Sequence, residues 1–210
     1  MKNLLPRREL GRLFGDVTFR EFSHKDMEEI KRMKPQTLFG LALSTWKRIV
    51  QFNLLPVSPE ALAGDIERKD PEVHAKISKI IGAPVIKDIS YVSAAVNGQG
   101  RNQRTVAEIF AVRVYPNNLH LADVEFERPV RPADGGAYKD MIGEYTGLFT
   151  KVAKNAIRYG KSQGCNYLLL AARSPYHAEI FAKAGFLMED HIAESRAQEL
   201  GIGIPMIRQL

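Results

Sequence analysis

The stretch from Lys139 to Phe186 constrains the fold of this chain more than any other, because two kinds of periodicity alternate in it. In its first part, apolar residues return every three or four positions, which predicts a long amphipathic helix. The apolar stripe consists of Met141, Ile142, Tyr145, Leu148, Phe149, Val152, Ala153, Ala156 and Ile157, and the other side carries Lys151, Lys154, Asn155, Arg158 and Lys161. Gly164 is expected to end this helix, since glycine adopts positive φ at little cost.

A buried strand and a second helix follow in the same stretch. The segment Tyr167–Ala172 is apolar on both faces, which is typical of a strand inside a parallel or mixed sheet. Ser174 and Pro175 then suit the first turn of a short helix, and Gly185 is expected to end it. A strand flanked by two helices places the chain in the α/β class.

These residues resemble the C-terminal half of the GNAT acyltransferase superfamily. The resemblance is carried by Gly164-Cys165 before an apolar strand, by the helix ending Phe181-Ala182-Lys183-Ala184-Gly185-Phe186, and by a last segment, Ile204–Leu210, similar to that family's last strand. It covers about residues 85–210. It implies a GNAT-like mixed central sheet of about seven strands, flanked by helices.

The rest of the chain agrees with that expectation. A strand is expected at Val17–Phe22, a helix after Ser23 and Asp26 that Pro35 breaks, and a second helix over Gln36–Phe52. Three antiparallel strands are expected at Val85–Val96, Thr105–Tyr115 and Leu119–Glu127. The resulting order is β-α-α-β-β-β-α-β-α-β-β, with an extra helical segment at residues 53–84, in one domain spanning residues 1–210.

Composition limits the classes of protein to consider. At 210 residues, 45% apolar and 26% charged, the chain has the composition of a soluble globular domain. The longest weakly polar run, Leu38–Trp46, is about half of the roughly 20 residues that a membrane helix needs, so no membrane span is expected. No apolar signal core follows the basic start, and the single cysteine, Cys165, excludes an internal disulfide and is expected in the core. We therefore expect a cytoplasmic protein.

The net charge of +6 favours anionic partners, which include a phosphorylated cofactor, an acidic carrier protein and nucleic acid. No zinc-finger spacing, aromatic-rich RNA-binding signature or long basic tail is present, so nucleic acid is an unlikely partner. The five histidines are scattered without paired ligand spacing, and we predict no metal site.

The segment Arg131–Ala137 is the candidate phosphate loop. Small residues before a helix let backbone N–H groups approach a phosphate, and the helix dipole favours negative charge there. The GNAT pyrophosphate loop has Arg or Gln, two residues, Gly, one residue, then Gly or Ala, whereas three residues follow Arg131 before the first glycine. A plain turn is the alternative. The resemblance implies acetyl-CoA or a longer acyl-CoA as cofactor, and the residues expected to bind it are Arg128, Arg131, Gly135, Gly136 and Ala137.

Glu108 is the first candidate for a general base. By the two-residue period of a strand it shares a face with the apolar residues Val106, Phe110, Val112 and Val114. The alternative is a structural salt bridge to Arg104 or to an edge lysine. Glu125 is the next candidate. It shares a face with Asp123 and Glu127, which could line an acceptor groove, and a solvated face of the strand is the alternative.

The resemblance also concerns a general acid. Many GNAT enzymes carry a tyrosine four residues before the glycine of the Gly-Phe pair, but that position is Phe181 here, which cannot donate a proton. Tyr176 lies about one helical turn away and is the candidate acid, whereas His177 is expected on the helix surface.

These features predict an acyl-CoA-dependent N-acyltransferase, which moves an acyl group to a small amine or a protein acceptor. Two alternatives stay open. One is an enzyme like the N-acyl amino acid and acyl-homoserine-lactone synthases, which take acyl chains from acyl carrier protein. The other is a GNAT-like module that binds acyl-CoA without catalysis.

Overall fold

Seven strands form one mixed sheet in the order β1-β2-β3-β4-β5-β7-β6. The computed structural model describes residues 4–68, 70, 72–97, 103–126, 138–172, 175–189 and 203–210, with side chains from residue 147 onward in the long helix. The strands are β1 (Val17–Ser23), β2 (Ile86–Asn97), β3 (Gln103–Val114), β4 (Asn118–Phe126), β5 (Tyr167–Ala172), β6 (Leu187–Met188) and β7 (Ile204–Gln209). Strands β4 and β5 are parallel, and the other neighbours are antiparallel. The expected mixed sheet is confirmed.

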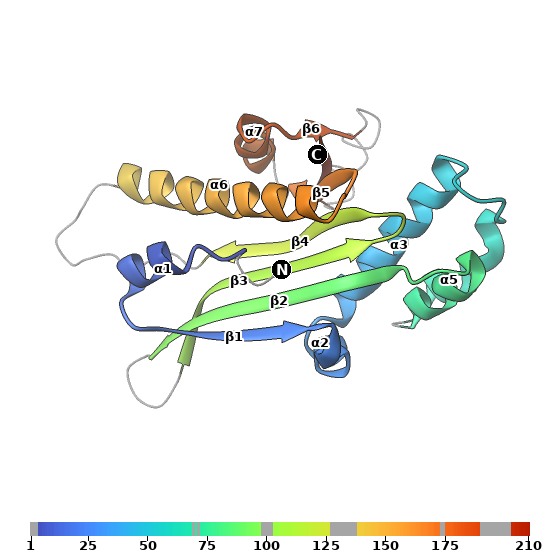
Figure 1. The fold of residues 1–210 in the computed structure, drawn as a ribbon, viewed down its shortest axis with the longest axis horizontal. Coiled ribbons are helices and arrows are strands. Elements are labelled where there is room, and N and C mark those ends of the chain that lie inside the picture. Colours follow the sequence, from blue (N-terminus) through green and yellow to red (C-terminus); the bar gives the residue numbers. More distant parts are fainter. Residues whose placement is uncertain are drawn as a thin grey trace.

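Helices cover both faces of this sheet (Figure 1). The helices are α1 (Arg7–Phe14), α2 (Met27–Met33), α3 (Pro35–Gln51), α4 (Ala63–Glu67), α5 (Val73–Ile81), α6 (Tyr138–Ser162) and α7 (Pro175–Lys183), with short 3-10 turns at η1 (His24–Asp26) and η2 (Pro59–Leu62). Helices α1 and α6 lie in front of the sheet in Figure 1, whereas α3 crosses behind it and α5 packs beside α3. From β1 onward the expected order is confirmed, and η2, α4 and α5 form the expected extra helical segment.

Each face of the sheet has its own hydrophobic core. The α6 core joins α1, α6 and α7 to the sheet, and Cys165 is buried in it as expected of a small core residue. The α3 core joins α3 and α5 to the opposite face and contains Trp46, which is 3% exposed and so confirmed as a core residue. Both cores draw on β2, β3 and the strands beside them, so the central strands are buried on both faces.

Local sequence signals end the elements where they were expected. Ser23 and Asp26 form a capping box, and Lys34 separates α2 from α3, which begins at Pro35. Gly164 and Gly185 have φ of 62° and 81°, and they follow α6 and α7 as predicted. No helix within the described ranges is both long and apolar enough to cross a membrane.

Helix α1 was not expected. Its sequence is dominated by arginines, and only Leu10 is fully buried in it, so the apolar repeat is too short to indicate a helix. Packing against the sheet stabilises this helix, because Leu4, Leu5 and Leu10 all belong to the α6 core. The N-terminal segment is therefore part of the folded domain.

Candidate active site

A β-bulge in β4 sets the geometry of the candidate site. Phe110 of β3 lies opposite Asp123, but the next residue, Ala111, lies opposite Leu121, so Ala122 is an extra residue in β4. Before the bulge, Leu119 and Leu121 point into the α6 core. After it, Asp123 and Glu125 lie opposite Phe110 and Glu108, on the face of the α3 core. The extra residue thereby brings three carboxylates onto one face of the sheet.

The two parallel strands separate at the same point. Strand β5 pairs with β4 only through Leu119, His120 and Leu121. Among the described residues, no strand pairs with that side of β4 from Ala122 to Phe126. This part of β4 therefore offers backbone N–H and C=O groups to an extended ligand, as the edge of a sheet does.

A second bulge corrects one expectation about β3. Ala94 of β2 lies opposite Ala107 and Ala95 lies opposite Thr105, so Val106 is the extra residue. Val106 packs in the α6 core, and the expectation that it shares a face with Glu108 is wrong. The other members of the predicted row, Phe110, Val112 and Val114, are together in the α3 core.

Glu108 is held by two donors from different elements. Lys34, between α2 and α3, donates from Nζ to Oε2 at 2.7 Å, and the Tyr91 hydroxyl of β2 donates to Oε1 at 2.6 Å. The side chains of Lys34 and Glu108 are 21% and 20% exposed. The salt bridge considered from the sequence is thus present, but its partner is Lys34 rather than Arg104 or an edge lysine.

Lys34 also joins the carboxylate of Asp123 to this cluster. Its Nζ lies 3.8 Å from Asp123 Oδ2, which accepts a hydrogen bond of 3.2 Å from the Thr37 hydroxyl. Burial lowers the pKa of Lys34, but the hydrogen bond to Glu108 and the charges of Glu108, Asp123 and Glu125 outweigh it and raise the pKa overall. Lys34 is therefore a cation throughout the physiological range.

Aromatic packing fixes the remaining member of the cluster. The Tyr91 ring stacks on Phe22 with centroids 5.5 Å apart and meets Phe110 edge to face at 5.8 Å. The Lys34 ammonium lies 5.4 Å from the centre of the same ring. Burial and the hydrogen bond to Glu108 raise the pKa of Tyr91, so its hydroxyl keeps its proton and acts as a donor to the carboxylate.

An open cavity of about 400 Å³ adjoins these residues. It is lined by Thr105, Val106, Ala107, Glu108, Glu125 and Phe126. Glu108 and Glu125 lie directly opposite one another in the register of β3 and β4, and Glu125 is exposed. The cavity therefore presents two carboxylates, which suits a cationic or amine-bearing ligand, and a carboxylate there can accept a proton.

The other predicted site residues are not brought to this cavity. Tyr176 is 53% exposed on α7 and meets His177 edge to face at 5.8 Å, and it is not among the residues that line the cavity. Phe181 packs against Phe149 with centroids 4.3 Å apart. The predicted cofactor residues Arg128, Arg131, Gly135, Gly136 and Ala137 lie outside the described residues.

Sequence reasoning missed Lys34, Thr37 and Tyr91. The hydrogen bond between Lys34 and Glu108 joins residues 74 positions apart, and a lysine at a helix junction carries no local signal of its partner. Tyr91 carries no local signal either, because β2 contains other polar residues such as Asp88 and Ser90. Within the described ranges, no cluster of three or more histidine, cysteine, aspartate or glutamate residues could hold a metal ion.

The fold and cavity together define a mixed α/β domain with an acidic cavity beside a separated pair of parallel strands. No family model matches the sequence, and a search of curated proteins returned no match.

The solved structures that this chain resembles include several acetyltransferases, one of which is described as a member of the GNAT family. A GNAT-family acetyltransferase from Staphylococcus aureus is 16% identical, with a TM-score of 0.37 over 93% of this chain and 99% of the other. A Bacillus subtilis acetyltransferase in complex with CoA is 13% identical, with a TM-score of 0.38 over 93% and 99%. A Bacillus anthracis acetyltransferase in complex with acetyl coenzyme A is 12% identical, with a TM-score of 0.37, and the match spans 58% of this chain and 62% of that one. At these values the likenesses do not decide what this chain does, and the fold is assigned from its own strand order and pairing.

Proposed function

We propose that this protein is an acyltransferase that moves an acyl group from acyl-CoA to an amine acceptor. The observation that carries the proposal is the bulge at Ala122, because it produces two features at one place. It turns Asp123 and Glu125 toward the face of Glu108, and it coincides with the separation of β4 from β5. A donor binding site and an acidic acceptor site therefore meet along the last residues of β4.

The separated edge of β4 supports an acyl-CoA donor. The pantetheine arm of CoA is an extended chain with two amides, and such a chain can hydrogen-bond to a free strand edge. CoA would supply the activated acyl group as a thioester. The phosphates of CoA are expected at Arg128, Arg131, Gly135, Gly136 and Ala137, which stays a prediction. The acetyl-CoA and CoA bound to the Bacillus enzymes agree with this donor class.

The carboxylates support an amine acceptor. An alkylammonium would be attracted by Glu108 and Glu125, and it must lose a proton before its nitrogen can attack a carbonyl carbon. We assign that proton to Glu108, with Glu125 as the alternative. Lys34 and Tyr91 hold Glu108 in one orientation, which fixes the direction from which the amine is met. Tyr176 stays a candidate acid for the departing thiolate.

The first experiment measures acetyl-CoA and longer acyl-CoA binding by calorimetry and acyl transfer to a panel of amines. Glu108→Gln should leave donor affinity unchanged and lower turnover roughly 10²–10⁴-fold, which is typical for loss of a general base. The residual rate should rise with pH as the free amine deprotonates by itself.

The matched control is Glu29→Gln, a change of the same kind at an exposed residue of α2. If Glu108→Gln turns over like Glu29→Gln while Glu125→Gln is slow, the base is Glu125. Tight acyl-CoA binding without transfer to any amine would indicate a binding module rather than an enzyme. No acyl-CoA binding at all would refute the proposed donor.

A further inference from the structure

The outer side of α6 carries a continuous positive face. Lys151, Lys154, Arg158 and Lys161 are spaced by three, four and three residues, so they form one stripe along the helix, and all four are exposed. The stripe spans ten residues, or about 15 Å at the helical rise. The helix has no acidic residue from Gly147 to Ser162.

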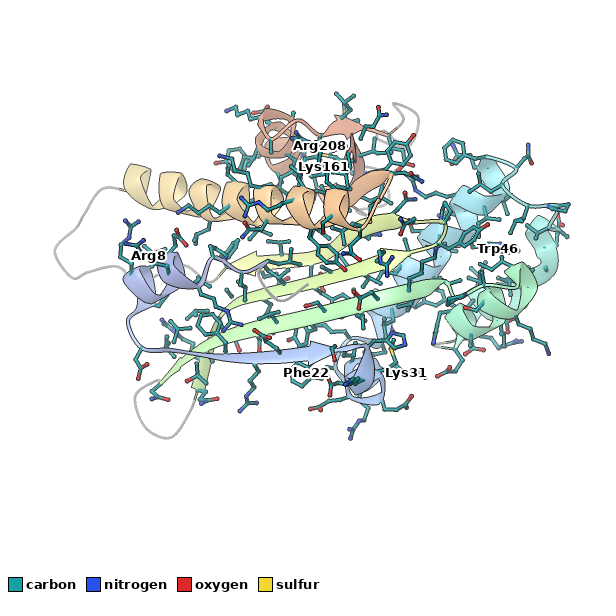
Figure 2. All side chains as sticks on the ribbon, in the orientation of Figure 1. Arg8, Phe22, Lys31, Trp46, Lys161 and Arg208 are labelled. Atoms are coloured by element: carbon teal, nitrogen blue, oxygen red, sulfur yellow. The ribbon has the colours of Figure 1, made fainter. Side chains whose placement is uncertain are left out.

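Helix α1 widens this positive face with Arg8 and Arg12. It lies along α6, because Lys151 forms an ion pair with Glu9 and the Asn155 amide donates to the Leu4 carbonyl at 3.3 Å. Figure 2 shows Arg8 beside the N-terminal half of α6 and Lys161 toward its other end. We call Arg8, Arg12, Lys151, Lys154, Arg158 and Lys161 the basic face.

Most of these charges have no partner within the described part of the chain. Lys151 is paired with Glu9, but no hydrogen bond or ion pair within the described residues involves the side chains of the other five. Other cations are paired with carboxylates, namely Arg7, Lys31, Lys34, Arg48, Arg68 and Lys76, whereas exposed lysines such as Lys25, Lys47 and Lys79 lie singly on other elements. The basic face therefore differs from the rest of the described surface in its grouping of several cations along two adjacent helices, where together they can attract an anionic surface over several ångströms.

The chemistry of the face favours a protein over a membrane or a nucleic acid. Exposed large apolar side chains, which would anchor the chain in lipid, lie on other elements, at Phe52, Leu54, Tyr176 and Leu187 for example. The basic face has no exposed aromatic side chain on which a base could stack. A stripe spaced by three and four residues instead matches an acidic helix, whose carboxylates repeat in the same way.

We infer that the basic face docks the acidic helix of a carrier protein that delivers the acyl group as a thioester on its own prosthetic arm. This inference rests on the proposed function and names a second donor for the same site. The chemistry is the same for both donors. The bond between the acyl carbon and the thiol sulfur breaks, a bond from that carbon to the amine nitrogen forms, and the proton lost by the amine ends on the released thiol.

The test uses purified acyl carrier protein without an acyl chain, so that binding is measured apart from turnover. Fluorescence anisotropy should give a Kd that rises steeply between about 50 and 300 mM salt, as expected for exposed charges. The double variant Lys154→Glu, Arg158→Glu should raise this Kd at least tenfold. Its control, Lys47→Glu, Lys79→Glu, makes the same charge change at exposed positions of α3 and α5 and should change the Kd less than twofold.

Turnover with the two donors separates this inference from the proposed function. The basic-face variant should keep its rate with acyl-CoA and lose at least tenfold in kcat/KM with the acylated carrier protein. Equal effects of both double variants, or no carrier binding at 0.1 mM (roughly −5.4 kcal/mol), would overturn the docking surface and leave acyl-CoA transfer intact. Binding of duplex DNA or anionic vesicles with the same dependence on Lys154 and Arg158, but not of carrier protein, would assign the face to that partner instead. Carrier binding without transfer from either donor would refute the proposed function alone.

Discussion

Replacing Lys34 by methionine should destabilise the protein by about 2 kcal/mol. The substitution keeps most of the apolar stem but removes the ammonium that contacts Glu108 at 2.7 Å and lies 3.8 Å from Asp123. Hydrogen bonds to charged groups are worth about 1.5–3 kcal/mol. Exposed ion pairs contribute about 0–1 kcal/mol and breaking a buried one costs about 3–5, and this pair is about one-fifth exposed. The expected loss in the free energy of unfolding therefore lies between the values for exposed and buried ion pairs.

The raised pKa of Lys34 fixes the pH range of this effect. A lysine whose pKa is higher in the folded state than its ordinary value of 10.5 contributes its full stabilisation below that value and loses it as the pH rises further. Wild type and Lys34→Met should therefore differ by the same amount at pH 6 and pH 8. The two should converge only above about pH 10.5.

Urea denaturation followed by fluorescence measures the difference, since Trp46 is the one tryptophan and is buried in the α3 core. A double-mutant cycle with Glu108→Gln isolates the pair, and its coupling free energy should be about 1–2 kcal/mol. Lys34→Arg keeps the charge and should recover part of the loss. A stability of Lys34→Met equal to that of the wild type, or a coupling near zero, would refute the reasoning that this ion pair holds the α2–α3 junction on the sheet.

Two further predictions concern other parts of the fold. Burial and the charge of Arg48 lower the pKa of His120 to about 4. The unfolded state therefore binds a proton at a higher pH than the folded state, and the free energy of unfolding should fall by up to about 3 kcal/mol between pH 6.5 and 4. Urea titrations at each pH should show a flatter dependence for His120→Gln. Gly185→Ala should cost about 1–2 kcal/mol because φ is 81° and the new methyl group would lie 2.5 Å from an Arg208 nitrogen. Gly82→Ala, with a φ of 66° and open space around it, is the control in the same denaturation assay and should cost less; an equal loss would show that the Arg208 contact contributes nothing.

Local sequence patterns were sufficient for most of the fold. The three-to-four residue repeat of α6, the apolar run of β5 and the glycines at positions 164 and 185 each depend on neighbours within a few residues, and the structure agrees with all of them. Helix α1 was missed because its burial comes from Leu10 meeting a distant sheet rather than from a repeated apolar pattern.

The site was less predictable because its contacts join distant segments. Glu108 was identified as unusual, but nothing near it in sequence indicates the ammonium of Lys34 or the hydroxyl of Tyr91. The alternation rule also assumes an uninterrupted strand. The rule placed Val106 on the wrong face. A bulge depends on how two strands pair, and the sequence of β3 alone does not indicate it.

The bulge at Ala122 reverses the alternation of side chains between the two faces of β4. One inserted residue decides which face of the sheet each later side chain of β4 occupies, whatever the identity of that side chain. Deleting Ala122 would leave Asp123 and Glu125 in the sequence but turn them into the apolar layer beneath α6, while Val124 and Phe126 would turn toward Glu108. A single-residue deletion at this point would thus exchange the two surfaces of the strand, a larger change than any one substitution can make. In a related sequence, an insertion or deletion near residue 122 would therefore say more about the chemistry of this face than a substitution there.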